Sequence, residues 1–91
     1  MALNIHHDSG ARRFTTQVDG HEAELIYRLQ DLRMTIDHTG VPDAIGGRGI
    51  AGELVKAALD YARAEGLRVV PACSYSAAYI QRHPQYADLV D

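Results

Sequence analysis

The sequence predicts an α/β (α+β) fold: a mainly antiparallel sheet with one parallel strand pair, one long helix after a glycine loop and a short C-terminal helix. Three observations carry this prediction. Residues 3–39 alternate apolar and polar side chains around two turn signals. A glycine cluster then opens a segment with helical periodicity, and an apolar run follows it. Ninety-one residues are enough for one domain at most, which we expect to span residues 1–91.

Two turn signals organise the N-terminal strands. Asp19-Gly20 is typical of a two-residue type I′ hairpin, because both central positions of that turn need positive φ. Gln30-Asp31 is a weaker signal for a second turn. Opposed residues share a face, so two such turns collect one apolar face. Its members are Phe14, Thr16, Val18, Ala23, Leu25, Tyr27, Leu29, Leu32, Met34 and Ile36.

The same two turns predict the register of the strands. In that register Tyr27 faces Met34, and Ala23 faces His38. We therefore expect His38 to end the apolar face of its strand. The alternation also continues through residues 3–7, which favours an additional strand at the edge of the sheet.

The segment after the loop Gly40–Gly49 predicts a helix that ends near Glu65. Polar residues recur every three or four positions and form one solvent-exposed face of the helix. The opposite stripe should pack on the apolar face of the sheet and consists of Ile50, Leu54, Ala58, Tyr61 and Ala62. Gly66 is the expected residue just past the helix end.

The C-terminal third predicts a strand and a second helix. Leu67–Ala72 is a nearly continuous apolar run typical of a buried strand, which we expect to lie parallel to Met34–Thr39 through a right-handed crossover. Ser74–Arg82 predicts a short helix with Ser74 as its N-cap, ending before His83-Pro84.

Composition excludes several classes of function. A net charge of −3 without a basic run argues against nucleic-acid binding. The longest apolar stretch, Val69–Cys73, is five residues, so we expect no membrane span. One cysteine precludes an internal disulfide, and no signal peptide is evident, so we expect a cytoplasmic protein. The five histidines lack ligand-type spacing, and no metal site is expected.

The glycine loop has the character of an anion site. The run Gly46-Gly47-Arg48-Gly49-Ile50-Ala51-Gly52 lies where a strand has ended and a helix begins. N–H groups in the first helical turn lack intrahelical partners, and glycine lets a phosphate approach them. A flexible loop that binds nothing is the alternative. A dinucleotide fingerprint matches formally, but the preceding strand is antiparallel and no acidic residue follows for a ribose. A P-loop is excluded because no Gly-Lys-Ser/Thr follows.

An ordered set of segments surrounds this loop, and the set as a whole is specific. Its members are Glu24–Tyr27, Met34–Thr39, Val41-Pro42, Arg48–Ala51, Val69–Tyr75 and Tyr79–Tyr86. In these segments, from Glu22 to Tyr86, the chain resembles a small single-domain branch of the GNAT superfamily of N-acetyltransferases. That superfamily's coenzyme A loop is written Gln/Arg-x-x-Gly-x-Gly/Ala. Gly49 and Ala51 fit its last two positions, whereas Gly46 stands where Gln or Arg is usual.

The resemblance implies a place for acetyl-coenzyme A. The strands at Ile36–Thr39 and Val69–Ala72 would splay apart around the pantetheine arm, whose amides would pair with the backbone of residues 38–41. The pyrophosphate would lie on the N–H groups of residues 48–52. The implied coenzyme A contacts are Thr39, Val41, Arg48, Gly49, Ile50, Ala51, Gly52, Ser74 and Tyr79. The strands that follow the last helix in larger members are missing here, which implies an open acceptor side.

Four residues are candidates for the chemistry of acetyl transfer, which needs a neutral amine and a proton for the leaving thiolate. His38 could take the amine proton, or it could simply cap the core. Cys73 could accept the acetyl group, or it could be a small buried apolar residue; we favour direct attack by the amine. The resemblance implies that Tyr75 or Tyr79 protonates the thiolate, although Tyr79 could instead pack against the sheet.

The predicted function is therefore transfer of acetyl from acetyl-coenzyme A to a primary amine on a small molecule or a protein. The alternative is a non-catalytic module that binds coenzyme A and senses its acetylation. A domain whose loop binds nothing is a third possibility. The sequence leaves the acceptor and the oligomeric state open.

Overall fold

The structure is a computed structural model that describes residues 3–91. Five strands form one sheet in the order β1-β2-β3-β4-β5, in which only β4 and β5 run parallel. The fold class is confirmed. The strands are β1 (His6–Asp8), β2 (Arg13–Val18), β3 (His21–Gln30), β4 (Arg33–Gly40) and β5 (Arg68–Pro71). The helices are α1 (Ile50–Ala64), α2 (Ser74–Arg82) and the 3₁₀ helices η1 (Asp43–Ile45) and η2 (Pro84–Leu89).

The first hairpin forms as predicted. Asp19 and Gly20 have φ of 51° and 78°, and Val18 pairs with His21 across them. The edge strand is also confirmed, although it spans only His6–Asp8, where His7 pairs with Phe14. These pairs place the apolar residues of β2 and β3 on one face, as the alternation indicated.

The second turn lies one residue later than predicted. Asp31 and Leu32 hold its two positive-φ positions, and Gln30 pairs with Arg33. The predicted register was therefore wrong by two residues: Tyr27 pairs with Ile36 and not with Met34. A two-residue slip keeps every side chain on its face, so the alternation could not detect it. It moves Leu32 out of the sheet and into the turn, where 68% of that residue is exposed.

A bulge in β4 changes the face of His38. Tyr27 pairs with Ile36, but the neighbouring Ile26 pairs with His38, which leaves Asp37 as an additional residue. The prediction that His38 ends the apolar face opposite Ala23 was wrong. The side chain of His38 is exposed on the face of the sheet that turns away from α1.

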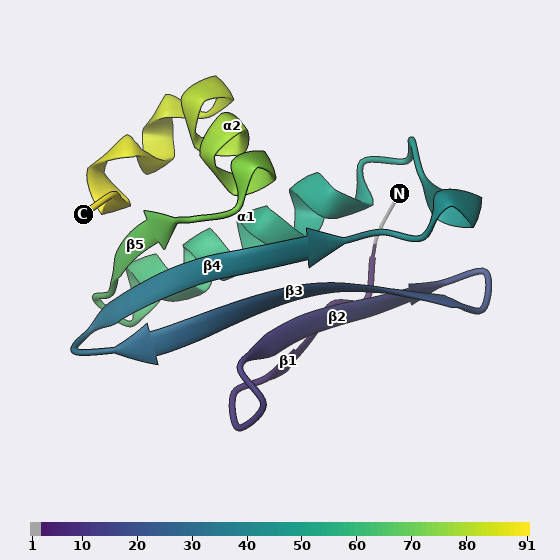
Figure 1. The fold of residues 1–91 in the computed structure, drawn as a ribbon, viewed down its shortest axis with the longest axis horizontal. Helices are drawn as coiled ribbons and strands as arrows, with labels where there is room; N and C mark the ends of the chain where they lie inside the picture. The colour runs from purple at the N-terminus through teal and green to yellow at the C-terminus, as the bar shows by residue number, and fades with distance from the viewer. Residues whose placement is uncertain (1–2) are drawn as a thin grey trace.

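Helix α1 covers the apolar face of the sheet, and Figure 1 shows it running along β4. The predicted stripe is buried apart from the half-buried Tyr61, and Val55 and Leu59 widen it. The helix ends in a Schellman motif, in which Gly66 has a φ of 69°. There the Leu67 N–H donates to the Ala62 carbonyl at 2.8 Å. Gly66 is thus confirmed as the stop.

The C-terminal segment packs beyond β5 (Figure 1). Helix α2 has the predicted bounds, but its N-cap is Cys73 and not Ser74, which is already helical. After η2, Val90 forms a single parallel bridge with Val69 on the free side of β5. No helix among residues 3–91 combines the length and apolar character needed to cross a membrane.

Candidate functional site

The parallel strands part at their C-terminal ends. Their ladder runs from Arg33↔Arg68 to Ile36↔Pro71, and the Cys73 N–H then donates to the Ile36 carbonyl at 2.9 Å. Beyond that point β4 continues to Gly40 paired with β3 alone, while the other chain turns into α2. The strands therefore separate as predicted, and residues 37–40 of β4 present their second edge to the gap.

Thr39 and Cys73 face each other across this gap. The Cys73 thiol donates to the Thr39 hydroxyl with an Sγ–Oγ1 distance of 3.8 Å. Burial raises the pKa of the thiol, but the N–H groups of Ser76 and Tyr75 and the Thr39 hydroxyl outweigh burial, so the pKa lies below its ordinary value. The N-terminal end of α2 thus favours the thiolate of Cys73.

The glycine loop opens α1 with an unobstructed backbone. Gly47 and the N-cap Gly49 have φ of 75° and 76°. A Cβ at either position would meet no other protein atom within 4 Å. The first backward hydrogen bond of the helix runs from the Glu53 N–H to the Gly49 carbonyl at 3.2 Å, so the N–H groups of residues 50–52 lie at the open end of the helix. This geometry suits an anion.

A cavity of about 260 Å³ adjoins the loop. Its lining residues are Val41, Ile45, Gly46, Gly47, Gly49, Ile50, Ala51 and Tyr75. Four of the predicted coenzyme A contacts lie here, together with Tyr75, which was predicted for a chemical role. The predicted contacts did not include three of the lining residues, Ile45, Gly46 and Gly47. Ile45 is fully buried in η1, and the loop sequence carried no capping or periodic signal that could have identified it.

Arg48 does not line the cavity. Its Nη1 donates to Asp19 Oδ2 at 2.7 Å, so its side chain extends toward the β2–β3 turn. Gly52 also lies outside the cavity lining, but it lets α2 approach α1 closely. A Cβ at position 52 would lie 3.3 Å from Tyr75 Oη and 3.5 Å from the Tyr79 ring. The two tyrosines thus lie over the first turn of α1.

The remaining predicted residues are more dispersed. Tyr79 is half-buried against the core and stacks on His83 with ring centroids 3.9 Å apart. Burial raises its pKa, with a smaller opposing effect of Lys56. Ser74 is exposed in the first turn of α2. His38 is exposed on the opposite face of the sheet from Thr39, which pairs with the buried Leu25.

The arrangement joins an anion cradle, a gap between two strands and two groups that can exchange protons. The cradle consists of backbone N–H groups, the gap exposes an unpaired strand edge, and the groups are the Cys73 thiol and the Tyr75 hydroxyl. Among residues 3–91 no cluster of three His, Cys, Asp or Glu side chains could hold a metal ion. The cradle and the gap together have the geometry that would suit an elongated anionic ligand.

Comparisons with known proteins agree with this geometry. The family model described as GCN5-related N-acetyl-transferase matches residues 13–89. Protein NATD1 of Gallus gallus is 40% identical over 85 residues, which cover 90% of this chain and 77% of that protein. The Homo sapiens NATD1 is also 40% identical, over 90% of this chain and 75% of its own.

A solved structure shares the fold over almost the whole chain. The NMR solution structure of a GCN5-like protein from Staphylococcus aureus superposes with a TM-score of 0.77 and 30% sequence identity. The match covers 98% of this chain and 88% of that one. With the family model matching most of the sequence and the fold reproduced, the chain belongs to the GCN5-related N-acetyltransferase family.

Proposed function

We propose that this protein binds acetyl-coenzyme A in the cavity at the N-terminus of α1 and transfers the acetyl group to a primary amine. One observation carries the proposal: the cavity beside the open glycine backbone is also lined by Val41, which follows β4, and by Tyr75 in the first turn of α2. The loop supplies donors for phosphates, and the gap that begins after Ile36 supplies a strand edge for amides.

The residues present fit the pyrophosphate of the cofactor. Gly47 and Gly49 leave their backbone open to a close approach, and the N–H groups of residues 50–52 lie beside them. Gly46 replaces the side chain that usually contacts phosphate in this family, and Arg48 is held by Asp19. Anion binding would therefore rest mainly on backbone N–H groups and the dipole of α1.

The parting strands fit the pantetheine arm. Residues 37–40 of β4 keep their second edge free of β5, so their backbone groups can pair with the amides of an extended chain. Thr39 and Cys73 line the two sides of the gap. The thioester end would then lie near the first turn of α2.

Acetyl-coenzyme A supplies an activated acetyl group as a thioester. The Tyr75 hydroxyl lines the cavity and can donate a proton to the leaving thiolate. Direct attack by the amine remains the favoured path, because the side chains that contact the Cys73 sulfur are the hydroxyls of Thr39 and Ser76, and neither is a general base. His38 can accept the amine proton from the exposed face.

Calorimetric titration tests the proposal. Acetyl-coenzyme A and coenzyme A should bind a folded sample, and NAD, which also carries a pyrophosphate and adenosine, should not. A screen of primary amines should then yield free coenzyme A with acetylated product. Binding without product from any amine would favour the non-catalytic sensing module. Absence of binding by a folded sample would refute both.

A further inference from the structure

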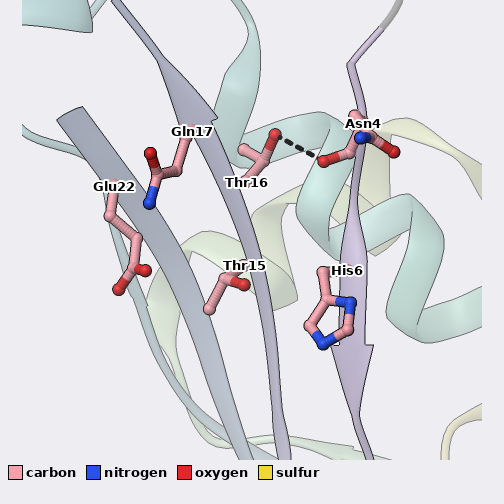
Figure 2. A pocket seen from close by; sticks show the side chains of 6 residues that line it. All are labelled: Asn4, His6, Thr15, Thr16, Gln17 and Glu22. Atoms are coloured by element: carbon pink, nitrogen blue, oxygen red, sulfur yellow. Dashed lines mark hydrogen bonds between the residues drawn. The ribbon is translucent and has the colours of Figure 1, made fainter. Parts of the chain in front are cut away.

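The face of the sheet that turns away from α1, here called the outer face, carries a polar depression of about 340 Å³. Figure 2 shows its side chains, which come from the start of the chain through β1, from β2 and from the beginning of β3. They are Asn4, His6, Thr15, Thr16, Gln17 and Glu22. The Thr16 side chain belongs to the buried face of the sheet, and its hydroxyl donates to the Asn4 carbonyl at 3.1 Å, which holds the start of the chain beside β2.

The depression lies in one row with the end of β4. His6 pairs with Thr15, Thr15 with Glu24, and Glu24 with Gly40. Because cross-strand partners share a face, this row crosses four strands on the outer face. Adjacent strands lie about 4.8 Å apart, so the row leads from the depression toward the gap over roughly 10–14 Å.

The bulge in β4 places His38 at the other end of the row. Its Nε2 would lie 2.7 Å from a Cβ at position 40, so the imidazole can lie over Gly40 only because that residue is glycine. The strands part immediately beside it, from Asp37 onward. The outer face therefore carries a polar depression at one end and an exposed imidazole beside the gap at the other.

Glu22 is the one carboxylate that lines the depression, and it belongs to a charged cluster beside it that favours a cation. Arg13 Nη2 donates to Glu22 Oε1 at 2.8 Å and to Glu24 Oε1 at 3.1 Å. Two carboxylates thus share one guanidinium, which leaves one net negative charge and an uncommitted Oε2 on each carboxylate. Gln17 adds an amide oxygen next to Glu22, its cross-strand partner. An ammonium group can find several acceptor oxygens here.

We propose that the outer face is the acceptor site, and that it takes an aliphatic amine carrying a second cationic group. This rests on the proposed function. The second ammonium would lie in the depression against Glu22, and the reacting amine would lie at the His38 end beside the gap. An extended di- or polyamine spans such a row, and the depression is small enough to suit a small molecule.

The test is an NMR titration of the ¹⁵N-labelled full chain, saturated with coenzyme A, with spermidine as the probe. We expect saturable shifts at the amides of His6, Thr15, Gln17 and Glu22. Glu22→Gln should weaken the affinity for spermidine about five-fold, as expected for the loss of one exposed ion pair. The matched control Asp31→Asn changes an exposed carboxylate at the far turn and should leave the affinity unchanged.

Specific outcomes overturn the proposal. Spermidine shifts that spare these four residues, or equal weakening by both variants, would remove the depression as the site. Butylamine has a single charge and should bind the wild type more weakly than spermidine does, and its affinity should not change in Glu22→Gln. An equal loss of affinity for both amines in this variant would contradict the role of the second cation. Acetyl-coenzyme A affinity is measured on the same samples, so a failure of the cradle is distinguished from a failure of the acceptor site.

Discussion

The Cys73 N–H donates to the Ile36 carbonyl at 2.9 Å, and this is the last backbone hydrogen bond across the parallel pair within residues 3–91. It fixes the point at which the strands part. Everything that we assign to the ligand lies on the far side of this bond: the free edge of β4, the start of α2 and the glycine loop. The position of the gap thus follows from where one ladder stops.

Substitution of the N-cap glycine should abolish cofactor binding. Gly49→Val places a β-branched side chain at a φ of 76° and covers the N–H groups of the first turn. We expect more than about a ten-fold loss of acetyl-coenzyme A affinity, equivalent to about 1.4 kcal/mol. Calorimetry measures the affinity. Gly49→Asn, which tolerates positive φ, controls for backbone strain and should fold normally; unchanged affinity in the valine variant would show that this backbone does not contact the phosphates.

Removal of the thiol should leave most of the activity. Direct attack does not use Cys73, so Cys73→Ala is expected to retain turnover with the Kd for acetyl-coenzyme A little changed. Near-total loss of turnover with intact cofactor binding would instead establish an acetyl-cysteine path. The lowered pKa has its own readout. The rate of alkylation by iodoacetamide should rise at a lower pH than for free cysteine, and acetyl-coenzyme A should slow it.

Tyr86 should make the fold sensitive to alkali. Its hydroxyl donates to Asp60 Oδ1 at 2.7 Å, and burial together with this hydrogen bond raises its pKa from 10.0 to about 12. A raised folded-state pKa stabilises the protein below the unfolded pKa, and that stabilisation is lost as pH rises through the folded one. Urea unfolding between pH 10.0 and about pH 12 should therefore show a free energy of unfolding that falls as the pH rises. Tyr86→Phe should flatten it and should cost about 1–2 kcal/mol at neutral pH. If the free energy of unfolding falls by the same amount in Tyr86→Phe, a group other than Tyr86 causes the pH dependence.

His7 should make the fold sensitive to acid. It stacks on Phe14 with ring centroids 3.9 Å apart, and its Nε2 lies 2.7 Å from Tyr27 Oη. Burial lowers its pKa, although Asp8 opposes the effect. The unfolded chain then binds the proton more readily, so stability should fall as pH drops below 6.5. Thermal unfolding of His7→Gln should lack this dependence while the hydrogen bond to Tyr27 is kept. An identical pH profile in both proteins would refute the assignment.

Local signals were sufficient to predict much of the fold. Asp19-Gly20 and Gly66 stand where positive φ is needed, and the helical stripe matches the buried face of α1. The second turn was misplaced because Asp31 serves a positive-φ position in either arrangement, and a two-residue slip leaves the faces intact.

The face of His38 could not be predicted from local patterns. Asp37, His38 and Thr39 are all polar, so the alternation ends after Ile36 and nothing in it specifies which of them points inward. The bulge determines which of these side chains points inward, and it lies where β4 separates from β5. Three residues at the start of α1 that line the cavity, Gly49, Ile50 and Ala51, were among the predicted contacts. Ile45 was missed, because the turn of η1 carried no capping or periodic signal.

Binding of acetyl-coenzyme A where α1 begins is the step on which the proposed function depends. An NMR titration of the ¹⁵N-labelled protein with acetyl-coenzyme A tests it most directly. We predict saturable binding, with the largest shifts at the amides of Gly47, Gly49, Ile50, Ala51 and Thr39. Saturable binding with the largest shifts elsewhere, or a folded protein whose spectrum does not respond, would contradict it.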